Sequence, residues 1–265
     1  MRTMHRGTRR GHGVAAAAWL LIVSLLGGCA GTAPHETPDS LMKEGQRLYL
    51  DKKYDEAIAR FQRAIELDNT RWAASVYIAR IYIAKRNWTL ALSNARTAFA
   101  VAPAGTDVRA TLAEALLGRG QAALAAGQFD DASALFGEYI ALSPVDRQGY
   151  LGAGQAYVGA GRYADALTAF ARGLQRDKSG PGRDELLKGL LDGGTKALQQ
   201  GDPKSAVLLL QEYTQQDPGN ADGFVILGKA LIEAGYRSDA RGALSRALQL
   251  NPAQAEAGDL LRSLR

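Results

Sequence analysis

Residues 147–179, RQGYLGAGQAYVGAGRYADALTAFARGLQRDKS, decide the fold of this 265-residue chain. Tyr157, Phe170 and Leu174 recur at helical spacing, and Gly161 marks a turn between two amphipathic halves. The stretch therefore predicts a helical hairpin. Neither helix is long enough to bury its apolar stripe alone, so the hairpin needs copies of itself on either side.

The rest of the chain supplies these copies. A small residue followed by another twelve positions later occurs six times, at Gly45/Ala57, Ala79/Ala91, Gly120/Ala132, Gly154/Ala166, Gly194/Ala206 and Gly228/Ala240. Each copy closes at one common offset, on Asn69, Pro103, Pro144, Lys178, Pro218 and Pro252. Proline at four of these places stops the second helix, so the pattern predicts six successive hairpins.

This pattern resembles the tetratricopeptide repeat, which has a period of about 34 residues. The resemblance implies an all-α solenoid with a helical hairpin at each of 38–71, 72–105, 106–146, 147–180, 181–220 and 221–252. A C-terminal capping helix at 253–265 follows, with Ala253, Ala257, Leu260, Leu261 and Leu264 on its apolar side. The pattern is specific for the fold and says little about function, because the residues that define it are packing residues.

Successive copies start 34 residues apart except at two places, where six or seven residues are added. The additions fall at residues 106–112 and around residues 181–186. They predict either about two more turns on the first helix of copies three and five or a longer loop before it. The array thus consists of three two-copy units, 75 and 74 residues apart.

Residues 1–28 have the order of a secretory leader. Four arginines precede a 13-residue apolar run at 14–26, which is shorter than the roughly 20 residues of a membrane-spanning helix. Leu26-Gly27-Gly28-Cys29 follows and resembles the bacterial lipobox, which implies that Cys29 is lipidated and becomes the new N-terminus. The alternative is an ordinary secretory signal with an incidental cysteine.

Residues 29–37 then form a lipidated tether that is rich in small and turn residues. Ala30 follows the cysteine, and by resemblance to enteric lipoproteins this favours the outer membrane, with the repeats facing the periplasm. The four leader arginines also account for most of the net charge of +5, because the chain from Cys29 onward has 28 basic and 27 acidic residues. We therefore expect no nucleic-acid partner.

The repeats offer few groups for chemistry. The histidines are His5, His12 and His35, and the single cysteine is Cys29, so the repeats lack imidazole bases, thiol nucleophiles and soft metal ligands. No phosphate-binding glycine loop is present either. We expect no catalysis, no metal and no cofactor.

Three rows of residues on the first helices form the candidate binding surface. The residue three positions before each first small residue is apolar: Met42, Val76, Leu117, Leu151, Leu191 and Val225. The residue one position after it is polar: Gln46, Arg80, Gln121, Gln155, Thr195 and Lys229. The residue four positions after it is apolar: Tyr49, Ile83, Leu124, Val158, Leu198 and Ile232.

In tetratricopeptide proteins these positions line the concave groove. The resemblance implies a groove with apolar walls and a hydrogen-bonding floor, suited to an extended peptide or an amphipathic helix. The alternative is that the apolar rows mainly pack against neighbouring copies. We expect binding to be strongest in the middle, at Leu117, Gln121, Leu124, Leu151, Gln155 and Val158.

These features predict a non-catalytic protein-interaction scaffold, anchored by lipid in a bacterial outer membrane, with protein partners in the cell envelope. The architecture resembles repeat lipoproteins that assist pili, secretins and outer-membrane barrel assembly. Two alternatives stay open. One is an adaptor for peptidoglycan enzymes or for polysaccharide export, and the other is a carbohydrate or peptidoglycan enzyme or binder, which the missing catalytic groups disfavour.

Overall fold

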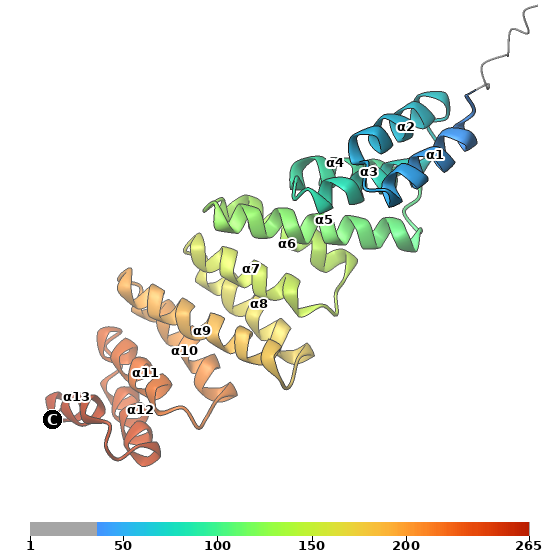
Figure 1. Cartoon of the computed structure of the whole chain (residues 1–265). Helices are drawn as coiled ribbons and strands as arrows, with labels where there is room; N and C mark the ends of the chain where they lie inside the picture. The colour runs from blue at the N-terminus through green and yellow to red at the C-terminus, as the bar shows by residue number, and fades with distance from the viewer. Residues whose placement is uncertain (1–35, 265) are drawn as a thin grey trace, which may run out of the picture. The chain divides into compact units, whose positions relative to one another are not determined.

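A computed structural model describes residues 36–264, and in this range the chain is an all-α solenoid of thirteen helices (Figure 1). The first helices of the six copies are α1 (Pro38–Leu50), α3 (Trp72–Ala84), α5 (Thr106–Ala125), α7 (Arg147–Gly159), α9 (Pro181–Gln199) and α11 (Ala221–Glu233). The second helices are α2 (Tyr54–Leu67), α4 (Trp88–Val101), α6 (Phe129–Leu142), α8 (Tyr163–Arg176), α10 (Pro203–Gln216) and α12 (Arg237–Leu250). The last helix is α13 (Ala255–Ser263). The predicted fold class is confirmed, and every first helix begins at the first residue of a predicted copy.

Each hairpin turns at one residue with a positive φ angle, at Lys52, Arg86, Gly127, Gly161, Gly201 and Gly235. Glycine adopts this left-handed conformation without the Cβ clash that other residues suffer. Four of the six turns are therefore visible in the sequence. The turns at Lys52 and Arg86 are not, because neither residue type signals a turn.

The residues added to copies three and five lie within helices. The helices α5 and α9 have 20 and 19 residues, against 13 in each of the other four first helices. The added turns of α5 bury Val108 against Val76 and Ala98, and those of α9 bury Leu186. The additions therefore extend the core rather than the loops.

In five of the six copies the first small residue is a glycine, and it makes room for a side chain sixteen positions later. A Cβ atom on Gly154 would lie 2.6 Å from Cζ of Phe170, which is closer than real Cβ atoms come to their neighbours. The same relation joins Gly45 to Phe61 and Gly228 to Leu244. Phe170 is fully buried, so this close contact is part of the core.

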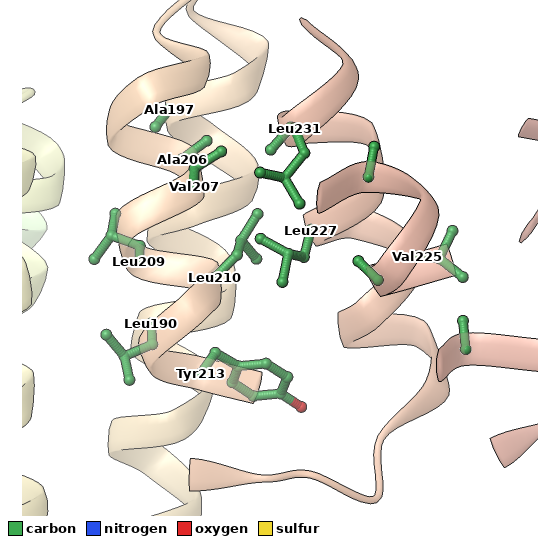
Figure 2. Close-up of a cluster of buried hydrophobic side chains, with 14 of the residues drawn as sticks. Leu190, Ala197, Ala206, Val207, Leu209, Leu210, Tyr213, Val225, Leu227 and Leu231 are labelled. Carbon is green, nitrogen blue, oxygen red and sulfur yellow. The ribbon is translucent and has the colours of Figure 1, made fainter. Parts of the chain in front are cut away.

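The buried side chains run from hairpin to hairpin. In the C-terminal half one cluster joins residues from α8 to α13, and Figure 2 shows Leu209, Leu210 and Tyr213 of α10 with Leu227 and Leu231 of α11 in this cluster. Because each hairpin buries its apolar face on the next, stability is shared between neighbours as in other repeat proteins.

The last helix covers the end of this cluster, and four of its five expected apolar residues contact the cluster. Ala257 and Leu264 are buried, and Leu260 and Leu261 pack against the cluster. Ala253, which we expected on the apolar side, precedes α13 and is exposed. Residue 265 lies outside the described residues, as do the leader, Cys29 and the tether up to residue 35.

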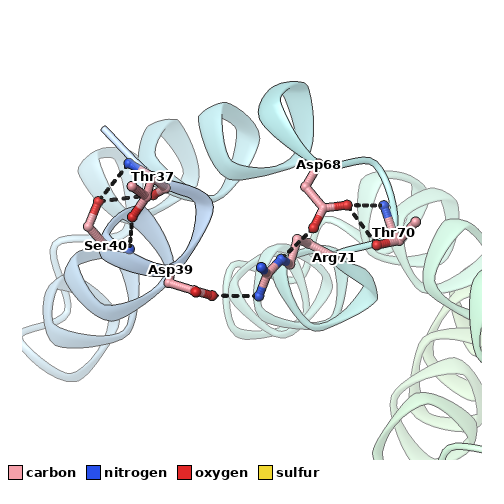
Figure 3. A network of polar contacts seen from close by, with 6 residues as sticks. All are labelled: Thr37, Asp39, Ser40, Asp68, Thr70 and Arg71. Carbon is pink, nitrogen blue, oxygen red and sulfur yellow. Dashed lines mark hydrogen bonds and ion pairs between the residues drawn. The ribbon is translucent and has the colours of Figure 1, made fainter. Parts of the chain in front are cut away.

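Polar contacts join the two ends of the first copy, next to the start of α3. Arg71, just before α3, contacts Asp68 and Asp39, with N–O distances of 2.7 Å in both pairs (Figure 3). The backbone N–H and hydroxyl of Thr70 donate to Asp68 as well. The hydrogen bonds from Thr70 and Arg71 lower the pKa of Asp68 below its ordinary value of 3.8.

The first helices form one continuous face. Each contacts the next first helix along the stack, whereas among the second helices only α8 and α10 contact each other. The predicted binding rows therefore lie on adjoining helices. Within residues 36–264, no helix has both the length and the hydropathy to span a bilayer.

Candidate functional site

An open groove of about 500 Å³ runs over α5, α7 and α9. Its lining residues are Gln121, Leu124, Phe136, Gln148, Leu151, Gly152, Gln155, Val158, Phe170, Glu185, Lys188, Gly189 and Asp192. Five of the six residues expected at the centre of the binding surface line it, and the sixth, Leu117, does not. The structure thus brings the middle of the three rows together at one hollow.

Glycines give the groove its depth. A Cβ atom on Gly152 would lie 2.7 Å from Cδ1 of Phe136, and one on Gly189 would lie 2.5 Å from Cε1 of Phe170. The two phenylalanines come from the second helices α6 and α8 and reach between the first helices. Because α7 and α9 carry no side chain at these points, the floor of the groove consists of backbone and ring edges.

The walls combine amides with apolar side chains. Gln121 and Gln155 are exposed, and Gln148 at the start of α7 is exposed too. Leu124 and Val158 are half-buried, each one turn further along its helix than a glutamine. A glutamine amide offers two N–H donors and an acceptor oxygen, so the groove has both hydrogen-bonding groups and apolar surface.

One wall of the groove is charged. Glu185, Lys188 and Asp192 are exposed residues of α9, and the ammonium of Lys188 donates to the carboxylate of Asp192. Within the described residues, Glu185 makes no ion pair. The groove lining therefore carries one net negative charge, which Glu185 contributes.

The first apolar row divides into two groups. Met42, Val76 and Val225 are buried in the core. They therefore do not offer surface to a partner, contrary to the expectation. They pack between neighbouring helices, as the alternative interpretation has it. The remaining three members of the row are half-buried: Leu117, Leu151 and Leu191.

The polar row also varies along the stack. Arg80 pairs with Asp107 of α5 at 3.4 Å, and Lys229 pairs with Glu256 of α13 at 2.5 Å. The hydroxyl of Thr195 donates to the carbonyl of Leu191 in its own helix. Gln46 is half-buried. Only the two central glutamines are both exposed and uncharged.

Every member of the second apolar row is half-buried: Tyr49, Ile83, Leu124, Val158, Leu198 and Ile232. The ring of Tyr49 packs against two other aromatic rings, those of Tyr54 and Tyr77. Leu124 and Val158 instead line the open groove. The row therefore lines the groove at its centre and packs against neighbouring side chains at its N-terminal end.

Sequence reasoning missed part of the lining. It did not single out Gln148, Gly152, Gly189 or the charged residues of α9. A signal for the glycines was present, since Gly152 stands where copies two and six have Tyr77 and Ile226. No comparable signal marked Glu185, because the added turns of copy five obscure its register with other copies.

The described part of the chain, residues 36–264, contains no group of three or more His, Cys, Asp or Glu side chains placed to hold a metal ion. What the groove offers chemically is non-covalent: apolar contact, amide hydrogen bonds and one free carboxylate.

Comparison with known proteins agrees with this geometry. Two models of the tetratricopeptide repeat match residues 117–181 and 197–264, together about half of the chain. The chain belongs to the tetratricopeptide-repeat family. This fold indicates a protein-interaction scaffold, since repeats of this family bind protein partners. No curated protein matches the sequence.

The chain is similar to several solved structures at low identity. The structure of Naa15/Naa10 bound to HypK-THB matches 86% of this chain with a TM-score of 0.54 and 17% identity. The match covers only 33% of the chain in that structure. YrrB, a tetratricopeptide protein with an unusual peptide-binding site, has a TM-score of 0.43 and 19% identity, covering 76% of this chain and 97% of its own. PilW, a type IV pilus biogenesis factor, has a TM-score of 0.38 and 16% identity, covering 84% and 98%. The likeness to the Naa15/Naa10 structure shows the fold alone.

Proposed function

We propose that this protein is a non-catalytic scaffold of the bacterial cell envelope that binds a segment of a partner protein in the groove over α5, α7 and α9. The observation that carries the proposal is the groove itself. Its lining combines exposed amides with half-buried apolar residues on three adjoining first helices. Such a surface suits a peptide segment, and interface energy usually concentrates at the centre of a contact.

The leader supports the cellular setting of the proposal. A basic start, a short apolar run and the lipobox-like LGGC imply lipidation of Cys29, and Ala30 favours the outer membrane. Lipid on Cys29 would hold the groove on the periplasmic face, where the scaffold assists assembly of a pilus, a secretin or an outer-membrane barrel. An adaptor role toward peptidoglycan enzymes or polysaccharide export would use the same groove.

The proposal is tested by pulldown of the lipidated protein from envelope extracts, with partners identified by mass spectrometry. The test variant carries Leu124→Glu and Val158→Glu, which place charge on the apolar walls. The matched control carries Gln175→Glu on the exposed side of α8, away from the groove. We expect the wild type and the control to capture the same envelope protein and the groove variant to lose it.

The identity of the captured protein separates the pathways. A secretin, pilus or barrel component supports assembly, whereas a murein hydrolase or synthase supports the adaptor role. Equal capture by the groove variant, with its helical content intact, would move the binding site to another face.

A further inference from the structure

Two of the six hairpin turns have a basic residue where the other four have glycine. Lys52 and Arg86 adopt the left-handed conformation, with φ angles of 59° and 54°. The equivalent residues of the later copies are Gly127, Gly161, Gly201 and Gly235. A residue with a Cβ atom is strained in this conformation, and strain of this kind is concentrated at functional sites. The first two copies therefore keep a basic side chain at a position where glycine would be more relaxed.

These two turns belong to a cluster of basic side chains on neighbouring copies. We call this cluster the basic edge, and its members are Lys52, Lys53, Lys85, Arg86 and Arg119. An ion pair of 2.5 Å between Lys85 and Asp55 of α2 joins the second turn to the first copy. Lys85, Arg86 and Arg119 line one shallow hollow of about 440 Å³, which places α5 beside the second turn.

The basic edge keeps an excess of positive charge. Lys85 pairs with Asp55, and among the described residues the other four cations make no ion pair. The other carboxylates at the first hairpin turn are Asp51, which pairs with Arg47, and Glu56. Four free cations against one free carboxylate leave a net charge of +3. Such a surface attracts an anionic partner.

An exposed leucine stands at the same edge. Leu50 ends α1, two residues before Lys52, and 78% of it is exposed. The corresponding residues of the other copies are all small or polar: Ala84, Ala125, Gly159, Gln199 and Glu233. A leucine beside lysines is typical of a surface that binds a bilayer, because the apolar side chain enters the headgroup region while the ammonium groups pair with phosphates. An acidic peptide would explain the lysines but not the leucine.

The basic edge also lies at the end of the solenoid that follows the lipobox-like LGGC. Residues 29–35 separate Cys29 from the described part of the chain, and these seven residues span at most about 25 Å when extended. The helix α1 has 13 residues, so Lys52 lies about 20 Å from the start of this helix. Lipid on Cys29 would therefore keep the first two turns within reach of the bilayer. The copies with glycine turns stack farther from the anchored end.

Resting on the proposed lipidation of Cys29, we propose that the basic edge is a second membrane contact, which binds anionic phospholipid headgroups of the bilayer that holds the lipid. The free cations of the edge contact the headgroup phosphates, and Leu50 enters the interface. Because a flexible tether does not fix an orientation, this second contact sets how the solenoid lies on the bilayer. The other possible occupant, an acidic segment of a partner protein, is an outcome of the test.

The test is cosedimentation of the protein with lipid vesicles. The chain from residue 29 onward carries Cys29→Ser, so that no acyl chain contributes to binding. One set of vesicles contains equal parts of phosphatidylglycerol and phosphatidylcholine, and the other contains phosphatidylcholine alone. We expect binding to the anionic vesicles only, and loss of this binding at high salt, since salt screens exposed charges.

The main variant combines Lys52→Gly with Arg86→Gly and so restores the glycine of the later copies. Each basic residue near an anionic surface strengthens binding about fivefold, so this variant should bind anionic vesicles about 25-fold more weakly. Its melting temperature should rise, because the strain at both turns is removed. Leu50→Gln should weaken binding without a change in charge. The matched control, Lys178→Gln with Arg246→Gln, removes the same charge from exposed positions of later copies and should bind like the wild type.

The outcomes separate this inference from the proposed function. Equal binding of the glycine variant and the wild type, or equal binding to both kinds of vesicle, would overturn the inference. A labelled hexaglutamate peptide that binds the basic edge when anionic vesicles do not would assign the edge to an acidic protein segment instead. Neither result bears on the groove or on Cys29, because the assay uses no acyl chain and no groove residue. Failure of the proposed anchoring would appear separately, as absent fatty-acid labelling of Cys29.

Discussion

Replacing Gly154 with alanine tests how the hairpins pack. The added Cβ atom would lie 2.6 Å from Cζ of Phe170, and this ring is fully buried. The ring cannot retreat toward α9, because a Cβ on Gly189 would lie only 2.5 Å from its Cε1 atom. One methyl group must therefore displace a ring that is enclosed on two sides.

The cost follows from two opposing terms. Overpacking of a buried site costs about 1–3 kcal/mol. Alanine in place of glycine within a helix gains about 0.8–1 kcal/mol. Gly137→Ala in α6 isolates the second term, because no atom lies within 4 Å of the added Cβ and the residue is exposed. The difference between the two variants is then the overpacking term alone.

The assay is thermal unfolding followed by far-ultraviolet circular dichroism. Gly137→Ala should raise the melting temperature. The melting temperature of Gly154→Ala should be lower than that of Gly137→Ala by about 2–4 °C for each kcal/mol of overpacking. Phe170→Ala removes the clash, so Gly154→Ala should cost little more in that background. Copy two has this combination in Ala79 and Ala95. Equal effects of both glycine replacements, or a cost of Gly154→Ala that is the same with and without Phe170→Ala, would refute the packing argument.

Three further predictions concern the anchor and the response to pH. Cys29→Ser should abolish labelling by a fatty-acid analogue and release the protein from membranes, since two or more acyl chains anchor stably; unchanged labelling would contradict the lipobox. The lowered pKa of Asp68 contributes stability above the unfolded-state pKa, which is lost as pH falls through the folded-state pKa, so Asp68→Asn should flatten the acid side of a plot of melting temperature against pH. Burial, together with the nearby charge of Asp217, raises the pKa of Tyr213 to about 12, so stability should fall as pH rises from about 10 to 12. Tyr213→Phe should reduce that fall. An alkaline stability profile that is the same in wild type and variant would contradict this role of Tyr213.

The fold was predictable because its requirements repeat. A small residue, a turn and a helix end recur at fixed offsets in six copies. This repetition is enough to predict the fold even though the residue types at two of the turns, Lys52 and Arg86, do not indicate a turn. The partner of the small residue was harder to recognise. The twelve-residue spacing pairs Gly154 with Ala166, but the side chain that lies against Gly154 is that of Phe170. The corresponding sixteen-residue spacing is also present in the sequence.

The candidate site was predictable only in part, because burial depends on neighbours. Val76 and Leu151 hold the same place in their copies, yet Val76 is buried and Leu151 is half-buried. Val108, from the added turns of α5, covers Val76. The charged wall depends likewise on how the longer α9 lies beside α7, which periodicity within one copy does not determine.

The most direct measurement of the central claim is site-specific crosslinking in living cells. A photoreactive phenylalanine analogue replaces Val158 in the groove and, in a separate strain, Gln175 on α8. We expect a defined adduct with one envelope protein from position 158, its loss when Leu124→Glu is added, and none of this adduct from position 175. The same adduct from position 175, or an adduct from position 158 that persists with Leu124→Glu, would contradict the groove as the binding site.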